Sequence, residues 1–230
     1  MSIKNQIYDI GDSLKIFHKE ISDTSRSIIE LLTNITEYRD INSGRHVKRT
    51  KDLMEILVFE LLRSSKLSAQ LEMLDYKKII HATPLHDIGK IAIPDNILLK
   101  NGKLSDREMQ IIKSHPIAGS EIIEGVRHCF DEIYYKHCHD ICLYHHENWD
   151  GTGYPYGLSG KEIPLSARIL SVVDSYDALT SERPYKKAYS HENAIKIIEK
   201  SQGRKFDPEI LRVFLEFSSK FTYGINYVGM

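Results

Sequence analysis

Residues 145–155 read His-His-Glu-Asn-Trp-Asp-Gly-Thr-Gly-Tyr-Pro, and residues 86–90 upstream read His-Asp-Ile-Gly-Lys. Consecutive residues of a helix point about 100° apart, so the adjacent His145 and His146 cannot both face a core from one helical turn. They suit a metal cluster in which each imidazole reaches a different ion. The upstream pair adds a nitrogen ligand and a carboxylate that can bridge two cations, with an ammonium group nearby. The two stretches together predict a metal centre.

The composition limits the class of protein and its surroundings. A chain of 230 residues can form one large domain, or one domain with an appendage. Its net charge of -1 creates no global positive field, so we expect neither DNA nor RNA as a partner. No apolar run approaches the roughly 18 residues of a membrane span, so we expect no membrane partner and a cytoplasmic location. Three cysteines are too few for a disulfide framework, which agrees with a reducing compartment.

Apolar residues recur at helical spacing along most of the chain, without a convincing β pattern. In residues 3–35 they follow a 3-4 alternation, which predicts a helix that packs along another helix. That second helix belongs either to the chain's own domain or to a second copy, and we favour a homodimer through this seam. Further helices are predicted over about 46–75, over residues leading into His86, and over 167–179.

Local signals mark where helices begin and end. Ser105 starts a capping-box pattern. Pro116 indicates that His115 projects from a helix end. Asp207 followed by proline predicts a helix N-terminus. The segment 148–164 is rich in glycine and contains two prolines, so we expect an irregular loop there.

The predicted fold class is therefore all-α. We divide the chain into an N-terminal helical segment at 1–36, which is the candidate dimerisation helix, a main domain at 37–218 and a C-terminal tail at 219–230. We predict no structure for the tail.

The eleven histidines of the chain cannot all be metal ligands. Six lack a partner pattern and are expected on the surface or in the core: His18, His81, His128, His137, His139 and His191. Asp140 follows His139, but no Gly-Lys follows that pair. Cys138 and Cys142 suggest a zinc site with the neighbouring histidines, although buried thiols on a helix are the favoured interpretation. The candidate ligands that remain are His46, His86, Asp87, His115, His145, His146 and Asp174.

The two motifs resemble those of the HD-GYP family of cyclic dinucleotide phosphodiesterases, and the resemblance runs from about Asp40 to Pro208. It implies an HD-type helical bundle with an irregular Gly-Tyr-Pro loop, here with an extra N-terminal helix. It also implies two divalent metal ions. One would be held by His46, His86 and Asp174, the other by His115, His145 and His146, with Asp87 bridging them. Ligand chemistry alone allows iron, manganese, zinc or nickel, and the resemblance favours iron or manganese.

The resemblance implies a function as well. The expected reaction is hydrolysis of cyclic di-GMP to the linear dinucleotide pGpG by a metal-bridging hydroxide, with further hydrolysis to GMP left open. Asp87 and Lys90 would act in catalysis, and Lys90, Tyr154, Arg183 and Lys186 would contact the substrate. The alternatives are hydrolysis of another cyclic dinucleotide such as cyclic GMP-AMP, hydrolysis of a simple nucleotide, and a non-catalytic receptor or adaptor.

One departure from the family pattern bears on the number of metal ions. Some members carry a glutamate four residues before the first ligand histidine, where it helps to bind a third ion. Asn42 occupies that position here. A neutral amide is a weak ligand, so we expect two ions. In the Gly-Tyr-Pro loop, we expect Asp150 to hold the loop in place and Trp149 to pack within it.

Overall fold

A computed structural model of the chain describes residues 31, 33, 46–182 and 187–221. These residues form ten α-helices and no β-strand, which confirms the all-α prediction. The helices are α2 (His46–Ser64), α3 (Ser68–Met73), α4 (Tyr76–Ala82), α5 (Asp95–Leu98), α6 (Asp106–Ile112), α7 (His115–Gly125), α8 (Glu132–Tyr144), α9 (Leu165–Thr180), α10 (His191–Glu199) and α11 (Pro208–Glu216). Short 3₁₀ helices are η1 (Thr83–Leu85), η2 (Ile88–Ala92), η3 (Arg127–Cys129) and η4 (Gly160–Glu162).

Several predictions lie outside this part of the chain. They concern Asn42, Arg183, Lys186 and the dimer seam of helix 3–35, of which only Leu31 and Thr33 are described, both helical. Among the described helices, none is both long and apolar enough to cross a membrane.

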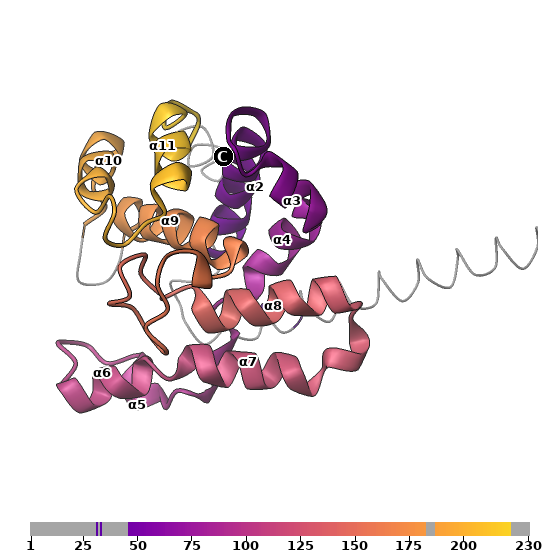
Figure 1. The fold of residues 1–230 in the computed structure, drawn as a ribbon. Helices are drawn as coiled ribbons and strands as arrows, with labels where there is room; N and C mark the ends of the chain where they lie inside the picture. Colours follow the sequence, from indigo (N-terminus) through magenta and orange to yellow (C-terminus); the bar gives the residue numbers. More distant parts are fainter. Residues whose placement is uncertain (1–30, 32, 34–45, 183–186, 222–230) are drawn as a thin grey trace, which may run out of the picture.

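Helix α9 occupies the centre of the fold. It packs against α2, α8, α10 and α11, and Figure 1 shows α7 and α8 side by side on one side of it, with α10 and α11 on the other. Most of its side chains are buried, including Ile169, Val172 and Tyr176. A helix that is buried on nearly all sides must be surrounded by other helices. The contacts with four helices account for the central position of α9.

The core extends from α2 to the end of the described chain. Leu53, Leu57 and Leu61 lie on the buried face of α2. Phe221 is fully buried and its ring lies 4.7 Å from that of Phe214, so packing continues into the segment assigned as a tail. The predicted N-cap at Asp207 is confirmed, because its carboxylate accepts the backbone N–H of the second helical residue.

The helical region predicted over about 46–75 consists of two helices, since α2 ends at Ser64 and α3 begins at Ser68. The hydroxyls of Ser64 and Ser65 donate to the carbonyls of Glu60 and Leu61, and Ser65 Oγ also accepts the N–H of Leu67. Serine side chains that bond to the backbone compete with helical hydrogen bonds. This local competition accounts for the break.

Candidate metal centre

The His-Asp pair lies where the chain turns between η1 and η2. His86 follows the last residue of η1, and Asp87 precedes the first residue of η2. The Nδ1 of His86 lies 3.0 Å from the carbonyl oxygen of Thr83, while its Nε2 lies 3.3 Å from Oδ2 of Asp87. The turn therefore directs both side chains toward one centre.

Gly89 allows α7 to approach this pair. A Cβ atom at Gly89 would lie 1.9 Å from the backbone oxygen of His115 and 2.4 Å from the backbone nitrogen of Gly119. The backbones of η2 and α7 consequently touch with no side chain between them. This contact places His115, the first residue of α7 as predicted, with its Nε2 3.2 Å from Oδ1 of Asp87.

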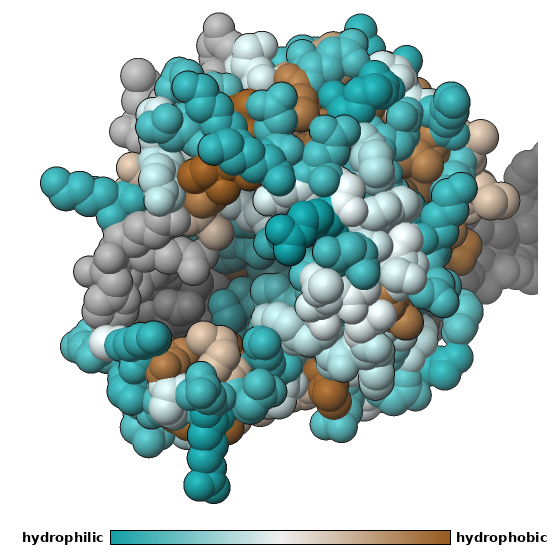
Figure 2. Space-filling model, turned by 60° about the vertical axis from the view of Figure 1, so that its left-hand side comes forward, coloured by the Kyte–Doolittle hydropathy of each residue, from teal (hydrophilic) through white to brown (hydrophobic). Residues whose placement is uncertain are grey.

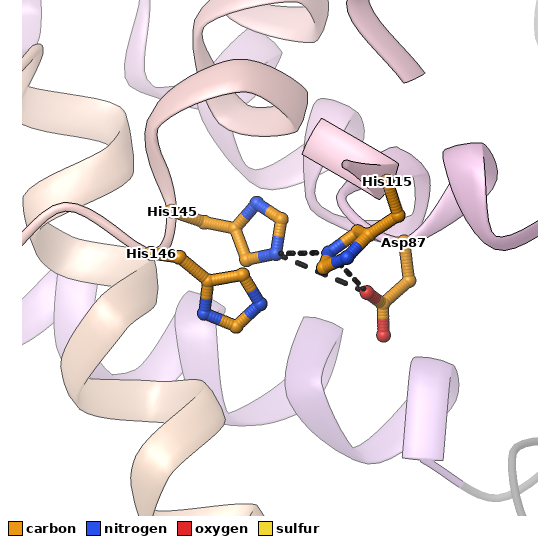
Figure 3. Close-up of side chains that lie close together, drawn as sticks. All are labelled: Asp87, His115, His145 and His146. Atoms are coloured by element: carbon orange, nitrogen blue, oxygen red, sulfur yellow. Dashed lines mark hydrogen bonds and ion pairs between the residues drawn. The ribbon is translucent and has the colours of Figure 1, made fainter. Parts of the chain in front are cut away.

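The first candidate metal group consists of Asp87, His115, His145 and His146, with ligand atoms within 4.8 Å of one another (Figure 3). His145 and His146 lie just beyond the end of α8. The Nε2 atoms of His115 and His145 are 3.3 Å apart, and His145 Nε2 lies 3.8 Å from Oδ1 of Asp87.

The second candidate metal group lies on the other side of Asp87 and consists of His46, His86 and Asp174. The Nε2 atoms of His46 and His86 are 3.2 Å apart, and His46 Nε2 lies 3.7 Å from Oδ1 of Asp174. It also lies 4.0 Å from Oδ2 of Asp87. One oxygen of Asp87 thus faces each group, and the structure brings together all seven residues predicted from the sequence.

The imidazole tautomers fit metal binding. The Nδ1 atoms of His86, His115 and His145 each lie 2.7–3.0 Å from a backbone carbonyl oxygen, which can only accept a hydrogen bond. Each Nδ1 therefore carries a proton, and each Nε2 is the ring atom directed at the centre as the potential ligand. Lone pairs 3.2–3.3 Å apart repel unless a cation or a proton lies between them. The two groups are consistent with a binuclear metal site.

The charge states of the first group also suit a metal. Burial and the neighbouring imidazoles hold the pKa of His145 well below its usual value, and burial lowers the pKa of His146 to about 3. Burial acts to raise the pKa of Asp87, but Lys90 and the surrounding histidines outweigh it and hold that pKa well below normal. At neutral pH His145 and His146 are therefore neutral imidazoles and Asp87 is an ionised carboxylate, the forms that bind metals.

His86 behaves differently, and we expect metal binding to release a proton. Burial favours neutral His86, but the charges of Asp87 and Asp174 outweigh it and raise its pKa above 6.5. Between pH 6.5 and that raised pKa the metal-free imidazole is protonated and must lose its proton to bind an ion. Metal affinity should therefore rise with pH through this range. Calorimetric titration in buffers of different ionisation enthalpy measures the released protons, and no release near neutral pH would contradict this assignment.

Two residues that the sequence analysis missed hold His46 in place. Asp177 is buried one helical turn after Asp174, and its Oδ2 lies 2.6 Å from Nδ1 of His46. Arg49 donates to both oxygens of the same carboxylate, at 2.6 and 3.1 Å. A carboxylate behind a ligand histidine fixes its orientation and raises its basicity. The spacing of Asp174 and Asp177 on one helix face was the available sequence signal.

Replacing Asp177 with asparagine should weaken metal binding by about 10- to 100-fold, the usual cost of losing a carboxylate behind a ligand histidine. The amide keeps the shape of the side chain but loses the charge that faces His46 and Arg49. Equilibrium dialysis against the metal measures the affinity. The matched control is Asp140→Asn, because Asp140 is also buried but pairs with Lys136 on α8. Equal affinity in both variants would contradict this role for Asp177.

The Gly-Tyr-Pro loop folds back over the second histidine of the pair. The ring of Tyr154 stacks on His146 at 4.7 Å between centroids, and the N–H of Tyr154 donates to the carbonyl of His146. A Cβ at Gly153 would lie 2.3 Å from the backbone nitrogen of Asn148, so only glycine fits where the loop folds back. Lys113 contacts the Tyr154 ring, with Nζ 5.1 Å from the ring centroid. Tyr154 is thus placed beside the centre, as a substrate-contacting residue would be.

Glu147 secures this loop, a role that the sequence analysis did not assign. Its carboxylate is buried and accepts the backbone N–H groups of Tyr156, Gly157 and Leu158 at 2.7–3.1 Å. Asp150 has the bracing role predicted for it, since its Oδ1 accepts both the N–H and the hydroxyl of Thr152. Asp150 lies outside both metal groups.

Lys90 lies beside the shared carboxylate, with Nζ 2.6 Å from Oδ2 of Asp87. The cysteines and the second His-Asp pair lie outside both groups. Cys142 is a buried thiol whose Sγ lies 3.1 Å from the carbonyl oxygen of Leu85, and His137 is buried against the carbonyl of Leu74. These positions agree with the structural roles predicted for them.

An all-helical bundle in which one carboxylate lies between two His/Asp groups is consistent with a helical metalloprotein that has a binuclear centre. A sequence model described as the HD domain matches residues 23–210. The chain belongs to the HD domain family, and the resemblance to its HD-GYP members is confirmed.

Known relatives agree with this assignment. The chain is 39% identical over 211 residues to a cyclic di-GMP phosphodiesterase of Vibrio cholerae, covering 91% of this chain and 43% of the relative. It is 35% identical over 217 residues to the 3′3′-cGAMP-specific phosphodiesterase 2 of the same organism, covering 94% of this chain and 39% of the relative. The chain spans about half the length of the curated relatives it matches.

The fold is similar to that of a solved HD-GYP-type protein, Bd1817 of Bdellovibrio bacteriovorus. The TM-score is 0.58 at 19% sequence identity, and the alignment covers 86% of this chain and 62% of the solved chain. At this identity the likeness concerns the fold alone.

Proposed function

We propose that this chain is a metal-dependent phosphodiesterase that hydrolyses cyclic di-GMP to the linear dinucleotide pGpG. The observation that carries the proposal is the pair of His/Asp groups on either side of Asp87, with one carboxylate oxygen facing each group. Relatives that match more than nine-tenths of the chain are named cyclic dinucleotide phosphodiesterases, which supports the same reaction here.

In this proposal His46, His86 and Asp174 would hold one ion, His115, His145 and His146 would hold the other, and Asp87 would be a ligand to both. When bound, two such ions supply an activated water and neutralise charge on the phosphoryl oxygens. The protein contributes position and electrostatics. Its buried imidazoles exclude bulk water, and Lys90 keeps Asp87 ionised and places a positive charge where the phosphate charge develops.

We propose two ions per chain, iron or manganese. The seven ligands give each ion four contacts when Asp87 is shared, which leaves positions for water and phosphate oxygens. Nitrogen and carboxylate ligands suit both metals, and the set contains no thiolate of the kind found in closed structural zinc sites. Asn42, in place of a glutamate, brings no charge to offset a third dication.

Substrate contacts are proposed for Lys90, Tyr154, Arg183 and Lys186. Replacing Arg183 or Lys186 with alanine should weaken cyclic di-GMP binding by about 1.5–3 kcal/mol, because each would remove one charge-assisted hydrogen bond. Metal content should not change. Steady-state kinetics of both variants measure the effect, and wild-type KM and kcat would show that neither side chain contacts the substrate.

Hydrolysis of 3′3′-cyclic GMP-AMP is the second candidate function, favoured by the similarity to a phosphodiesterase named for that substrate. Chromatography of products from each cyclic dinucleotide, with the manganese-loaded and iron-loaded protein, tests both. We expect pGpG from cyclic di-GMP at the higher kcat/KM. A higher kcat/KM for the mixed dinucleotide would reverse the assignment, and no turnover of either by fully loaded protein would favour a receptor or adaptor.

A further inference from the structure

Lys205 is a cation beside the metal groups to which neither motif assigns a role. It lies in the connection between α10 and α11, and its Nζ donates to Oγ of Ser175 at 2.7 Å. Ser175 directly follows Asp174, and its hydroxyl donates to the carbonyl of Ser171. The Ser175 hydroxyl proton is thus already used, and Oγ accepts the bond from Lys205. These contacts hold the ammonium group next to the residue that carries a candidate ligand.

The charge of Lys205 acts on both metal groups. It lowers the pKa of His146 in the first group and interacts with the carboxylate of Asp174 in the second. Burial lowers the pKa of Lys205 itself, and Asp174 opposes that shift. In the described part of the chain, no carboxylate oxygen lies within 4.0 Å of this ammonium group. A partly buried cation without a paired anion is a binding group for an anionic ligand.

Backbone hydrogen bonds tie this segment to the Gly-Tyr-Pro loop. The N–H of Trp149 donates to the carbonyl of Lys205 at 3.1 Å, and the N–H of Asp150 donates to that of Arg204 at 2.8 Å. The position of Lys205 is therefore fixed relative to the histidine pair that precedes the loop. A binding group attached to the same rigid framework as the metal ligands can hold one substrate in a defined pose.

A hollow of about 220 Å³ opens beside Lys205, between the loop and the end of α10. Its lining is polar and includes three cations, Lys200, Arg204 and Lys205, against one carboxylate, Asp150. That carboxylate already accepts two hydrogen bonds from Thr152. The hollow is several times the roughly 30 Å³ that one water occupies in the liquid. Figure 2 shows that one face of the molecule is mostly hydrophilic.

We propose that this hollow binds the second, non-reacting phosphate of the cyclic dinucleotide, with Lys205 as its principal contact. The inference rests on the proposed function. A cyclic dinucleotide carries two phosphodiester groups, and only the one being hydrolysed can occupy the metal centre. Its rigid ring holds the other phosphate nearby, where a single negative charge needs a positively charged partner. Lys205 stands between the metal groups and the basic hollow and supplies that charge.

The test compares two substrates that differ in the number of phosphodiester groups. Cyclic di-GMP has two, and bis(p-nitrophenyl) phosphate has one. With the manganese-loaded full chain, Lys205→Gln should raise KM for cyclic di-GMP about tenfold or more, because a charge-assisted bond is lost. Because the lost charge also faces both metal groups, the proteins are compared when saturated with manganese, and hydrolysis of the single diester measures any effect on the centre. The loss of kcat/KM should be about tenfold or more greater for cyclic di-GMP than for the single diester. Lys205→Arg should restore most of the loss. Lys196→Gln, which removes an exposed cation of α10 outside the hollow, is the control.

Three results would overturn the inference. An unchanged KM for cyclic di-GMP in Lys205→Gln would show that the hollow takes no part in binding. An equal loss on both substrates would place Lys205 at the reacting phosphate or in the stability of the centre. Failure of the proposed function is separately visible in the wild-type protein, as turnover of the single diester without turnover of either cyclic dinucleotide. In that case the substrate would not be a cyclic dinucleotide. No second phosphate would need a binding site, and the inference would fail.

Discussion

Asp87→Ala is expected to lose bound metal and phosphodiesterase activity together while the helices remain folded. Each oxygen of this carboxylate faces one of the two metal groups, at 3.2 Å from Nε2 of His115 and 3.3 Å from Nε2 of His86. Replacing a residue that hydrogen-bonds to a metal ligand lowers metal affinity by about 10- to 100-fold. Removing a ligand to both ions should therefore lower metal affinity by at least about 100-fold. Turnover of cyclic di-GMP should fall by at least the same factor.

The control for this change is Asp140→Ala, which disrupts the other His-Asp pair of the chain. Asp140 is buried on α8 and pairs with Lys136, away from both metal groups. Its replacement should leave metal content unchanged. Elemental analysis of each purified variant, with circular dichroism as the test of folding, measures the outcome. A folded Asp87→Ala protein with normal metal content and normal turnover would contradict the proposal that Asp87 is a ligand to both ions.

Gly89→Ala is expected to destabilise the protein by about 3 kcal/mol or more, the upper end of the cost of overpacking. The added methyl group would meet backbone atoms of α7 at 1.9 and 2.4 Å, and backbone cannot move aside as a flexible side chain can. Relief of the clash would separate η2 from α7 and therefore His115 from Asp87. Metal binding should weaken together with stability.

Gly125→Ala provides the matched comparison, because a Cβ at the end of α7 has no atom within 4 Å. That variant should be neutral or more stable by about 0.4–1 kcal/mol, since alanine restricts the unfolded chain. Urea unfolding followed by far-UV circular dichroism compares the two proteins. Similar stability of both would show that η2 and α7 are less closely packed than described.

The ligand set could be predicted from sequence because its members lie in short local patterns. His86 and Asp87 are adjacent, as are His145 and His146, and each pair recurs in the motifs that carry the family resemblance. Helical periodicity located α9, whose apolar residues are close together in the sequence. Local signals of this kind remain visible without knowledge of the tertiary structure.

The groups that support the ligands could not be found in this way. Arg49 and Asp177 are 128 residues apart, and only the packing of α2 against α9 brings them together behind His46. Lys205 reaches Ser175 across 30 residues. Neither contact follows a helical periodicity or a motif of fixed spacing, so the sequence alone does not reveal it. The break after Ser64 was missed for another reason. The apolar pattern continues past Ser64 and Ser65, but their hydroxyls bond to the backbone and interrupt the helix.

The measurement that tests the central claim most directly is a metal titration of the metal-stripped protein, followed by hydrolysis of cyclic di-GMP. Two His/Asp groups on either side of one carboxylate should make both ions necessary. The account predicts no turnover without metal, and full turnover when about two manganese or iron ions are bound per chain. Full turnover with one bound ion, or in the presence of excess chelator, would contradict it.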